Sequence, residues 1–254
     1  MLAVLSPAKK LNFDRPAKPM PETYPAFQED ANRLATIAQK LSVGDLRSLM
    51  HISEDLAKLN KARFDGFSAQ SSVDNAKQAM FAFAGDTYTG LEATGFDESD
   101  CSYAQDHLRI LSGLYGLLRP MDMIQPYRLE MGSKLKNDEG ATLYAYWGEK
   151  LCGALDAASS GAPVVNLASN EYFKAAREKK MVSPVITPSF KEDRNGELKM
   201  IGFFAKRARG AMARYIIKNR VQTVEGLKDF DLDGYKFQPG LSDEKTLTFT
   251  RSAG

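Results

Sequence analysis

The sequence is poor in the side chains from which disulfide scaffolds and histidine metal sites are built, with two cysteines, two histidines and one tryptophan. Cys101 and Cys152 cannot form the disulfide framework of a small secreted protein, and such low cysteine usage is typical of a reducing cytoplasm. His51 and His107 are too few for a histidine-rich metal site. We therefore expect neither a bound metal nor a cofactor.

Long apolar runs are also missing, which argues against a membrane-spanning helix. The apolar start, residues 1–5, is too short for a signal peptide, and Lys9 and Lys10 follow it where signal-peptide charges would precede it. We expect a cytoplasmic protein that does not contact membranes. Because the formal net charge is only +2, a nucleic-acid surface would require local clustering of cations.

A chain of 254 residues with 43% hydrophobic and 26% charged residues is typical of a soluble globular protein with a substantial core. No repeat or linker divides it, so we expect one domain over 1–254. The apolar patterns predict a mixed α/β (α+β) fold, a mixed sheet surrounded by helices. Strands are expected at 1–5, 163–167, 185–191, 198–204, 235–237 and 247–251, the third and fourth joined by the turn Asn195-Gly196. Helices are expected at 26–41, 42–50, 54–64, 73–83, 98–111, 142–157 and within 198–224, with an extended loop over 12–25 and irregular structure over 112–132.

The two short helices over 42–50 and 54–64 have clear start signals. Ser42 with Asp45 resembles a capping box, and Ser53 is a good N-cap for the second helix. The pair is similar to a helix-hairpin-helix, whose backbone N–H groups hold a nucleic-acid phosphate, although His51 and Ser53 replace its usual glycines. Helix pairs without that role are commoner. The second helix carries the cations Lys58, Lys61 and Arg63.

Residues 198–224 contain seven cations and no acid. On a helix, Ala205, Ala208, Met212, Tyr215 and Ile216 share one arc, which we expect to be buried. Like charges at i,i+4 spacing repel by a few tenths of a kcal/mol per pair, so an anionic partner would stabilise this helix. The alternatives are basic side chains that lie along the protein surface and a membrane-surface helix. We expect a nucleic-acid backbone contact with a log–log salt slope of about −4 to −5. The cations are Lys199, Lys206, Arg207, Arg209, Arg214, Lys218 and Arg220.

The mostly apolar stretch 108–132 contains three arginines, which are costly to bury unless an anion meets them. Glycines and prolines interrupt it, so it is not one helix. Two interpretations are open. Arg128 pairs internally with Glu130 or Asp122, which is the commoner arrangement, or Arg119 and Arg128 face a cleft and hold phosphate.

Two turns that follow predicted strands add polar groups. Lys9 lies on the loop after the first strand, and Ser169 caps a helix that follows the strand ending near Asn166. A strand, a polar turn and a helix N-terminus form a geometry that accepts anions. An ordinary connecting turn and a solvated lysine are the alternatives, and on the residues alone they are favoured.

Four motifs stand in order along the chain. They are Leu5-Ser-Pro-Ala-Lys9; Arg109-x-Leu111-Ser-Gly-Leu-Tyr-Gly116-x-Leu-Arg-Pro120 followed by Pro126-Tyr-Arg-Leu-Glu-Met-Gly132; Asn166-Leu-Ala-Ser169 with Glu171-Tyr172; and Ala205-Lys-Arg-Ala-Arg-Gly210. Together they resemble the YaaA family of peroxide-stress proteins over essentially the whole chain. The resemblance implies protection against hydrogen peroxide with lower free intracellular iron.

The first functional hypothesis is a cytoplasmic protein of the peroxide response that binds DNA, double-stranded or branched, by its backbone. It would limit free iron and DNA damage, with no protein partner expected. The nucleic-acid contacts would be Lys58, Lys61, Arg63, Lys206, Arg207, Arg209, Arg214 and Lys218.

The alternative is an enzyme acting on a nucleotide-like or anionic small molecule in a cleft that includes Lys9, Arg119, Arg128 and Glu130. The anion-binding residues would be Ser6, Lys9, Arg119, Tyr127, Arg128, Asn166 and Ser169, and the catalytic candidates Lys9, Glu130, Glu171 and Tyr172. The weakest hypothesis is iron handling by Asp97, Glu98, Asp100 and His107.

Overall fold

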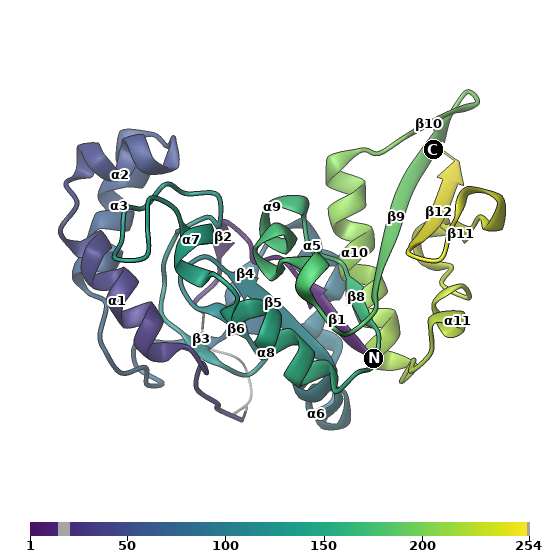
Figure 1. Ribbon diagram of the computed structural model, residues 1–254, viewed down its shortest axis with the longest axis horizontal. Helices are drawn as coiled ribbons and strands as arrows, with labels where there is room; N and C mark the ends of the chain where they lie inside the picture. Colours follow the sequence, from purple (N-terminus) through teal and green to yellow (C-terminus); the bar gives the residue numbers. More distant parts are fainter. Residues whose placement is uncertain (15–20, 253–254) are drawn as a thin grey trace.

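The computed structural model describes residues 1–14 and 21–252, so residues 15–20 of the loop predicted over 12–25 lie outside the described part. A mixed sheet of eight strands runs through the middle of these residues (Figure 1). Its strand order is β11-β12-β9-β8-β1-β5-β6, with β10 paired to β9, and the pairs β5/β1, β1/β8, β8/β9 and β9/β12 are parallel. The predicted mixed α/β fold is confirmed. The strands of this sheet are β1 (Leu2–Leu5), β5 (Leu108–Ser112), β6 (Gly116–Leu118), β8 (Val164–Asn166), β9 (Val185–Arg194), β10 (Glu197–Lys199), β11 (Lys236–Phe237) and β12 (Thr246–Ser252).

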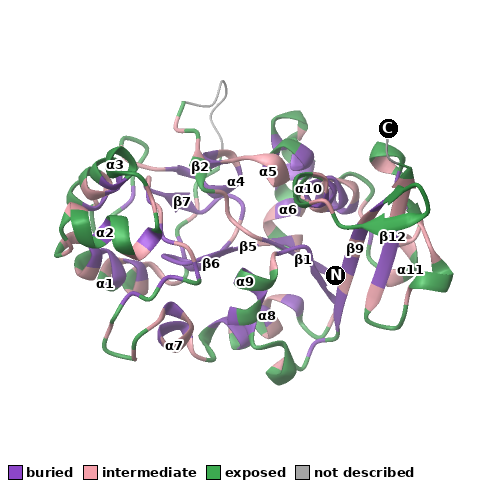
Figure 2. Ribbon diagram, turned by 90° about the horizontal axis from the view of Figure 1, so that it is seen from above, coloured by how far each residue is buried: buried purple, intermediate pink, exposed green. Residues whose placement is uncertain are grey.

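Helices cover both faces of the sheet. Figure 2 shows α5, α6 and α10 on one face and α7, α8 and α9 on the other, while α1, α2 and α3 gather at one end of the molecule. Covering both faces explains why β1 and β8 are buried along their whole length and consist of almost uninterrupted apolar residues. The helices are α1 (Gln28–Gln39), α2 (Val43–Met50), α3 (Glu54–Asp65), α4 (Ala79–Ala82), α5 (Asp86–Leu91), α6 (Glu98–His107), α7 (Leu143–Trp147), α8 (Lys150–Ser159), α9 (Asn170–Phe173), α10 (Gly202–Lys218) and α11 (Val224–Leu227). None of the helices in the described residues has the length and apolar character needed to cross a membrane.

Two glycines bring α5 and α10 into backbone contact. A Cβ atom added to Gly210 would clash with the carbonyl oxygen of Thr87, and one added to Gly90 would clash with that of Arg207. Only glycine fits at such a crossing, because the clashing atoms belong to the backbone and cannot rotate away. This close approach places the first half of α10 beside the segment that precedes α5.

Several local predictions are confirmed. Ser42 and Asp45 form the capping box of α2, and the hydroxyl of Ser53 accepts a hydrogen bond from the first turn of α3. Asn195 and Gly196 both have positive φ and join β9 to β10, as their hairpin turn requires. The predicted strand pair at the C-terminus is β11 with β12.

The helix predicted over 73–83 is wrong. This segment forms β3 (Lys77–Gln78), the single-turn α4 and β4 (Phe83–Ala84), where β3 pairs with β7 (Met123–Ile124) and β4 with β2 (Lys10–Leu11). The amides of Ala79 and Met80 donate to the carbonyls of Asp122 and Pro120 at 2.9 Å each. Backbone partners from a distant segment therefore replace the hydrogen bonds that a continuous helix would make within itself.

One predicted helix ends early, and another is divided in two. The helix over 98–111 stops at His107, and residues 108–112 become the sheet strand β5 because their backbone pairs with β1. The helix over 142–157 divides into α7 and α8 at Gly148, whose positive φ breaks the helical path. The predicted strand over 198–204 also stops at Lys199, and α10 begins at Gly202.

Candidate functional site

A cleft of about 420 Å³ opens at the carboxyl ends of β1 and β8. From β1 the chain crosses to β5 on one side, and from β8 it continues to β9 on the other, so the strand order reverses between these two strands. Open α/β sheets bind ligands at such a switch point. The loop after β1, the loop after β8, the segment 84–87 and residues 127–130 supply the walls, together with parts of α9 and α10. We call this cavity the switch cleft.

The loops after β1 and β8 are tied together at the floor of the switch cleft. The backbone N–H of Ser169 donates to Ser6 Oγ at 2.8 Å, the two serine hydroxyls lie 3.3 Å apart, and the Tyr88 hydroxyl donates to the carbonyl of Ser6 at 3.0 Å. Ser169 stands at the N-cap position of α9, but its side chain makes no capping hydrogen bond. The predicted N-cap position is therefore confirmed, but the side-chain capping hydrogen bond is not made, since the hydroxyl contacts Ser6 instead.

A carboxylate lies between two cations on one wall of the switch cleft. Glu130 Oε1 accepts hydrogen bonds from Arg128 Nε at 3.2 Å and Nη2 at 2.9 Å, and lies 3.1 Å from Lys9 Nζ. Arg128 and Glu130 side chains are each 14% exposed, whereas Lys9 is 68% exposed. Both interpretations of Arg128 therefore describe part of the structure, because it pairs internally and also lines the cleft. An ion pair to a lysine as exposed as Lys9 contributes little and can be exchanged for another anion.

Tyr127, Glu171 and Tyr172 complete the side of the switch cleft away from α10. The Glu171 carboxylate accepts the backbone N–H of Gly132 at 2.9 Å with one oxygen, and its second oxygen has no hydrogen-bond partner in the described part of the chain. Tyr127 and Tyr172 are buried, and burial raises the pKa of both hydroxyls well above the ordinary value. The Tyr127 hydroxyl lies 2.6 Å from that of Ser112. Both phenols therefore stay protonated near neutral pH and can donate hydrogen bonds. The four catalytic candidates, Lys9, Glu130, Glu171 and Tyr172, all line one cavity.

Two cations of α10 also line the switch cleft. Lys206 and Arg209, one helical turn apart, project from α10 into it, although the sequence led us to place them on a nucleic-acid surface. Within the described part of the chain, neither side chain has an ion pair or a hydrogen-bond partner. Arg209 is half-buried, and burial lowers the pKa of its guanidinium. The site therefore contains a partly desolvated positive charge without a counter-charge.

Arg119 and Asn166 do not line the switch cleft. Arg119 donates to Asp122 Oδ1 from Nε at 3.1 Å and from Nη2 at 2.9 Å, so Asp122, which we considered as a partner of Arg128, pairs with Arg119 instead. The Asn166 side chain bonds to Thr187 Oγ1 at 3.3 Å and accepts the N–H of Ala168 at 3.1 Å. Both side chains are held by protein groups and help to shape the structure around the cleft.

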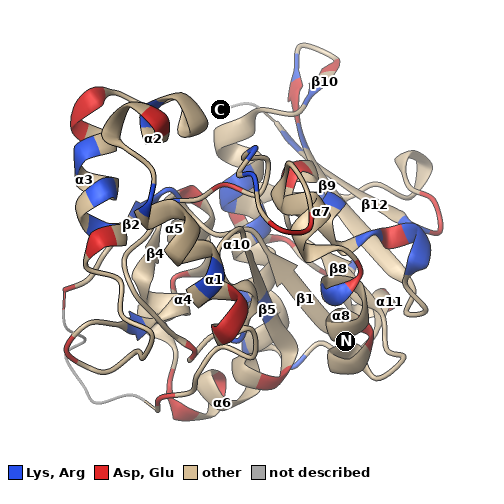
Figure 3. Ribbon diagram, turned by 60° about the vertical axis from the view of Figure 1, so that its left-hand side comes forward, with Lys and Arg blue, Asp and Glu red and all other residues tan. Residues whose placement is uncertain are grey.

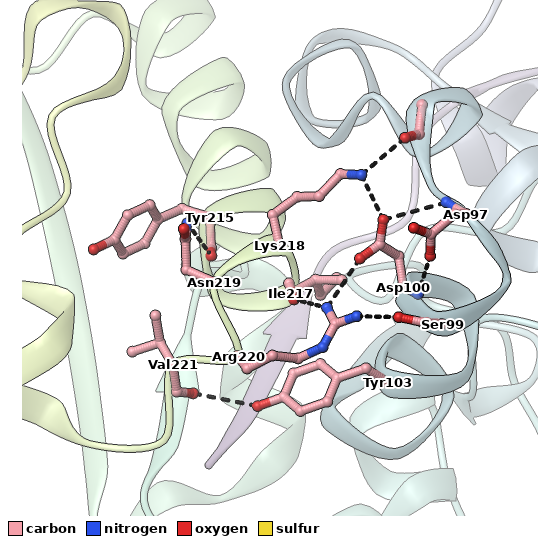
Figure 4. Close-up of polar contacts among 11 residues, drawn as sticks. Asp97, Ser99, Asp100, Tyr103, Tyr215, Ile217, Lys218, Asn219, Arg220 and Val221 are labelled. Atoms are coloured by element: carbon pink, nitrogen blue, oxygen red, sulfur yellow. Dashed lines mark hydrogen bonds and ion pairs between the residues drawn. The ribbon is translucent and has the colours of Figure 1, made fainter.

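The other cations of α10, and Arg220 just after it, have carboxylate partners from distant segments. Arg207 lies 3.4 Å from Asp233, and Arg214 pairs with Glu92. Lys218 and Arg220 share the buried carboxylate of Asp100, as Figure 4 shows. Burial acts to raise the pKa of Asp100, but the hydrogen bonds from the two cations outweigh it and hold that pKa below the ordinary value. The positive surface expected along this helix is thus largely neutralised outside the switch cleft.

The cations of α3 are likewise partnered. Lys58 pairs with Glu54 at 2.7 Å and Lys61 with Asp65, and Figure 3 shows the Lys and Arg positions of this helix between acidic positions at its two ends. Arg63 donates to Asn60 at 3.3 Å, and its pKa is lowered by burial and by the charge of Arg128. The turn before α3 holds His51 in the left-handed region, as a tight helix–helix connection requires. The geometry is that of a packed helix pair, and its phosphate-binding role remains a prediction.

Sequence reasoning missed the wall formed by residues 84–87. Gly85 has a φ of +151°, and Asp86 and Thr87 follow it at the start of α5. The sequence showed that a helix would not continue through Gly85. Nothing in it indicated that the crossing of α5 and α10 at Gly90 and Gly210 places this wall beside Arg209. Lys10 was seen only as a charge beside the first strand, and it also lines the switch cleft.

The residues proposed for iron are engaged elsewhere. Asp97 and Asp100 form the capping box of α6, and the ring of His107 stacks on Tyr103 with centroids 4.0 Å apart. Among the described residues there is no group of three or more His, Cys, Asp or Glu side chains arranged to hold a metal ion.

Fold and site together define an α/β protein with a polar, cation-lined cleft at the switch point of its parallel strands. The chain belongs to the peroxide stress protein YaaA family, whose family model matches residues 1–241. The resemblance seen in the four motifs is thereby confirmed. The chain is 52% identical to a UPF0246 protein of Alteromonas mediterranea, with 99% of this chain and 98% of that protein covered. It is also 52% identical to UPF0246 proteins of Dinoroseobacter shibae (99% and 95% covered) and Caulobacter vibrioides (99% of each).

Proposed function

We propose that this member of the peroxide stress family acts by binding the phosphate group of a ligand in the switch cleft, with Arg209 and Lys206 as the principal contacts. The observation that carries the proposal is the half-buried guanidinium of Arg209, which has no counter-charge among the described residues. A charge removed from water is costly unless an anion meets it. A guanidinium matches phosphate in geometry because two of its N–H groups donate in parallel.

The other cations of the switch cleft support the same ligand class. Lys9 is exposed, so its ion pair with Glu130 is weak and Lys9 can bind another anion instead. Lys10 follows it in the lining of the cleft. A ligand phosphate that reaches Arg209 and Lys206 can therefore recruit Lys9 as well. Hydroxyl groups of Ser6 and Ser169 line the floor between these cations and add neutral donors. If the ligand is chemically changed there, Glu130 and Glu171 are the acid–base groups at hand, with Tyr172 as a protonated donor.

The test is titration of the intact protein with inorganic phosphate by isothermal calorimetry, for the wild type, Arg209→Met and Arg207→Met. Loss of a hydrogen bond to a charged group costs about 1.5–3 kcal/mol, so we expect roughly 10- to 100-fold weaker binding for Arg209→Met. Arg207→Met is the matched control, since it removes the same charge from the same helix outside the cleft. Absence of phosphate binding at millimolar concentrations, or an equal loss in both variants, would contradict the proposal.

DNA-backbone binding in the cytoplasm, with lower free iron and less DNA damage under peroxide, is the second candidate. It is supported by the acid-free run 198–224, by the exposed Lys206 and by the tight α2–α3 connection. The two buried, unpaired cysteines fit a cytoplasmic location. The carboxylate partners of Arg207, Arg214 and Lys218 lower the charge available to a duplex.

A salt series on duplex, single-stranded and branched DNA tests this candidate. If it is right, the wild type binds with a slope of about −4 to −5, and Arg207→Glu/Arg214→Glu binds more weakly with a shallower slope. Absence of DNA binding at low salt would contradict this candidate. Equilibrium dialysis with ferrous iron separately measures whether the protein itself takes up iron.

A further inference from the structure

Resting on the proposed phosphate site, we infer that the switch cleft selects a terminal phosphate on a hydroxyl-bearing group, that is, the phosphomonoester of a sugar, over the phosphodiester of a continuous strand. The inference deepens the proposed function by naming the chemical class of the ligand. It follows from the charge balance of the lining, from the placement of its carboxylates and from its size.

The charge balance matches a dianion. Five cationic and three acidic side chains line the cavity, which leaves a formal excess of +2. A phosphomonoester carries about −1.5 to −2 charges at pH 7, whereas a phosphodiester carries about −1. A dianion neutralises the excess, including the partly desolvated Arg209. The remainder of the ligand is then neutral, which favours hydroxyl groups over an ammonium as the donors to the carboxylates.

Among the three acids of the lining, Glu171 lies on the opposite face of the sheet from the two unpaired cations of α10, whereas Asp86 begins α5 on the same face as α10. Lys206 and Arg209 project from α10, whereas Glu171 belongs to α9, and Figure 2 shows these helices on opposite sides of the strands. The free oxygen of Glu171 and the hydroxyls of Ser6 and Ser169 can pair with hydroxyls of a sugar. A second phosphate continuing past the first would instead meet the carboxylates of Glu171 and Glu130. Like-charge contacts of this kind discriminate against a wrong ligand.

The volume of about 420 Å³ falls in the range of small-ligand sites. It accommodates one sugar phosphate or one nucleotide, whereas a duplex can contact only its open side. A terminal phosphate on a sugar can therefore come from two sources. One is a free sugar phosphate or mononucleotide. The other is the phosphorylated end of a nucleic-acid strand whose last residue enters the cleft.

The experiment compares ligands by calorimetry at fixed ionic strength and pH 7.5. The probes are inorganic phosphate, ribose 5-phosphate, adenosine 5′-monophosphate, a dinucleoside phosphodiester without terminal phosphate, and a short single strand with and without a terminal phosphate. We expect the monoesters to bind at least 10-fold tighter than the dinucleoside phosphodiester and tighter than inorganic phosphate. If the phosphorylated strand binds better than the monoesters, the source is a strand end; if it binds worse, the source is a small molecule.

The outcomes separate this inference from the proposed function. If inorganic phosphate and every ester fail to bind, the phosphate site itself is wrong. If inorganic phosphate binds and Arg209→Met abolishes that binding, but the phosphodiester binds as well as ribose 5-phosphate, only the present inference is overturned.

A substitution checks the part assigned to the acids. Glu171→Gln keeps a side-chain oxygen for the N–H of Gly132 while it removes the negative charge. We expect the preference for monoester over phosphodiester to fall at least threefold, with inorganic phosphate bound as well as or better than by the wild type. Glu178→Gln, at an exposed position outside the cleft, should leave the preference unchanged. An unchanged preference in Glu171→Gln would show that the carboxylate charge does not select the ligand, and it would overturn the inference.

Discussion

Two sets of cations on one helix behave differently. Lys206 and Arg209 project from α10 into the switch cleft without carboxylate partners among the described residues, while Arg207 and Arg214 pair with Asp233 and Glu92. All four are close in sequence, and all were predicted to contact nucleic acid. The comparison teaches that the direction in which a helical side chain points decides whether its charge remains available.

The two sets also differ in what they do to stability. An exposed ion pair such as Arg207–Asp233 contributes about 0–1 kcal/mol. A half-buried guanidinium without a partner costs stability, because part of its hydration is lost without a compensating interaction. A residue that lowers the stability of the folded protein in this way is typical of functional sites. Experiments that separate the two sets therefore test the assignment of the site.

The largest effect is expected from breaking the crossing that places α10. Gly210→Ala adds a methyl group against the carbonyl of Thr87, so α10 must move away from α5 and from the segment 84–87. We expect a loss of about 3 kcal/mol or more in the free energy of unfolding, measured by urea denaturation. Gly153→Ala in α8 is the control, since its added Cβ meets no atom within 4 Å. That variant should be unchanged or more stable by about 0.5–1 kcal/mol. Equal losses in the two variants would contradict the crossing.

The next largest effect concerns the best-paired cations. Asp100→Asn leaves Lys218 and Arg220 without their shared carboxylate, and we expect a loss of about 2–4 kcal/mol at pH 7. Because the folded state lowers the pKa of Asp100, its contribution is present above the ordinary carboxyl value of 3.8 and is lost as pH falls through the folded value. Urea denaturation from pH 7 downward should therefore show a constant difference between the two proteins above the ordinary carboxyl pKa and a shrinking difference below it. A difference that stays constant below that value as well would argue against an ionised, hydrogen-bonded Asp100.

A smaller effect of opposite sign is expected for the unpaired set. Arg209→Met removes the half-buried charge and keeps much of the apolar contact of the stem, so we expect a gain of up to about 1 kcal/mol in stability together with loss of phosphate binding. Thermal unfolding without ligand measures the gain. A destabilised Arg209→Met would indicate that the guanidinium has a structural partner.

The smallest effect is expected for Arg207→Met. Its side chain is 48% exposed and its only ion pair within the described residues is at 3.4 Å, so stability should change by less than about 0.5 kcal/mol. Phosphate affinity should match that of the wild type. A change in Arg207→Met as large as in Arg209→Met would remove the distinction between the two sets.

Much of the cleft was predictable because the motifs that carry the family resemblance converge there. Ser6, Lys9, Tyr127, Arg128 and Ser169 line it as expected. Arg119 was placed in the same group because it shares a motif with Arg128, but its partner Asp122 lies only three residues away in the chain. The pattern of charged residues alone could not decide between an internal pair and a ligand contact for either arginine.

What the sequence by itself determined is the local structure. Apolar runs, capping residues and the Asn195-Gly196 turn placed β1, β8, α2, α3 and the β9–β10 hairpin, because each depends on neighbours within a few residues. Only the tertiary structure decided that residues 108–112 form a sheet strand and that 77–84 form no continuous helix, since their hydrogen-bond partners come from distant segments. The tertiary structure also decided which cations of the basic segment lack a carboxylate partner among the described residues. Carboxylates such as Glu92, Asp100 and Asp233 contact α10 only in the folded protein, and no pattern within the basic segment predicts these contacts.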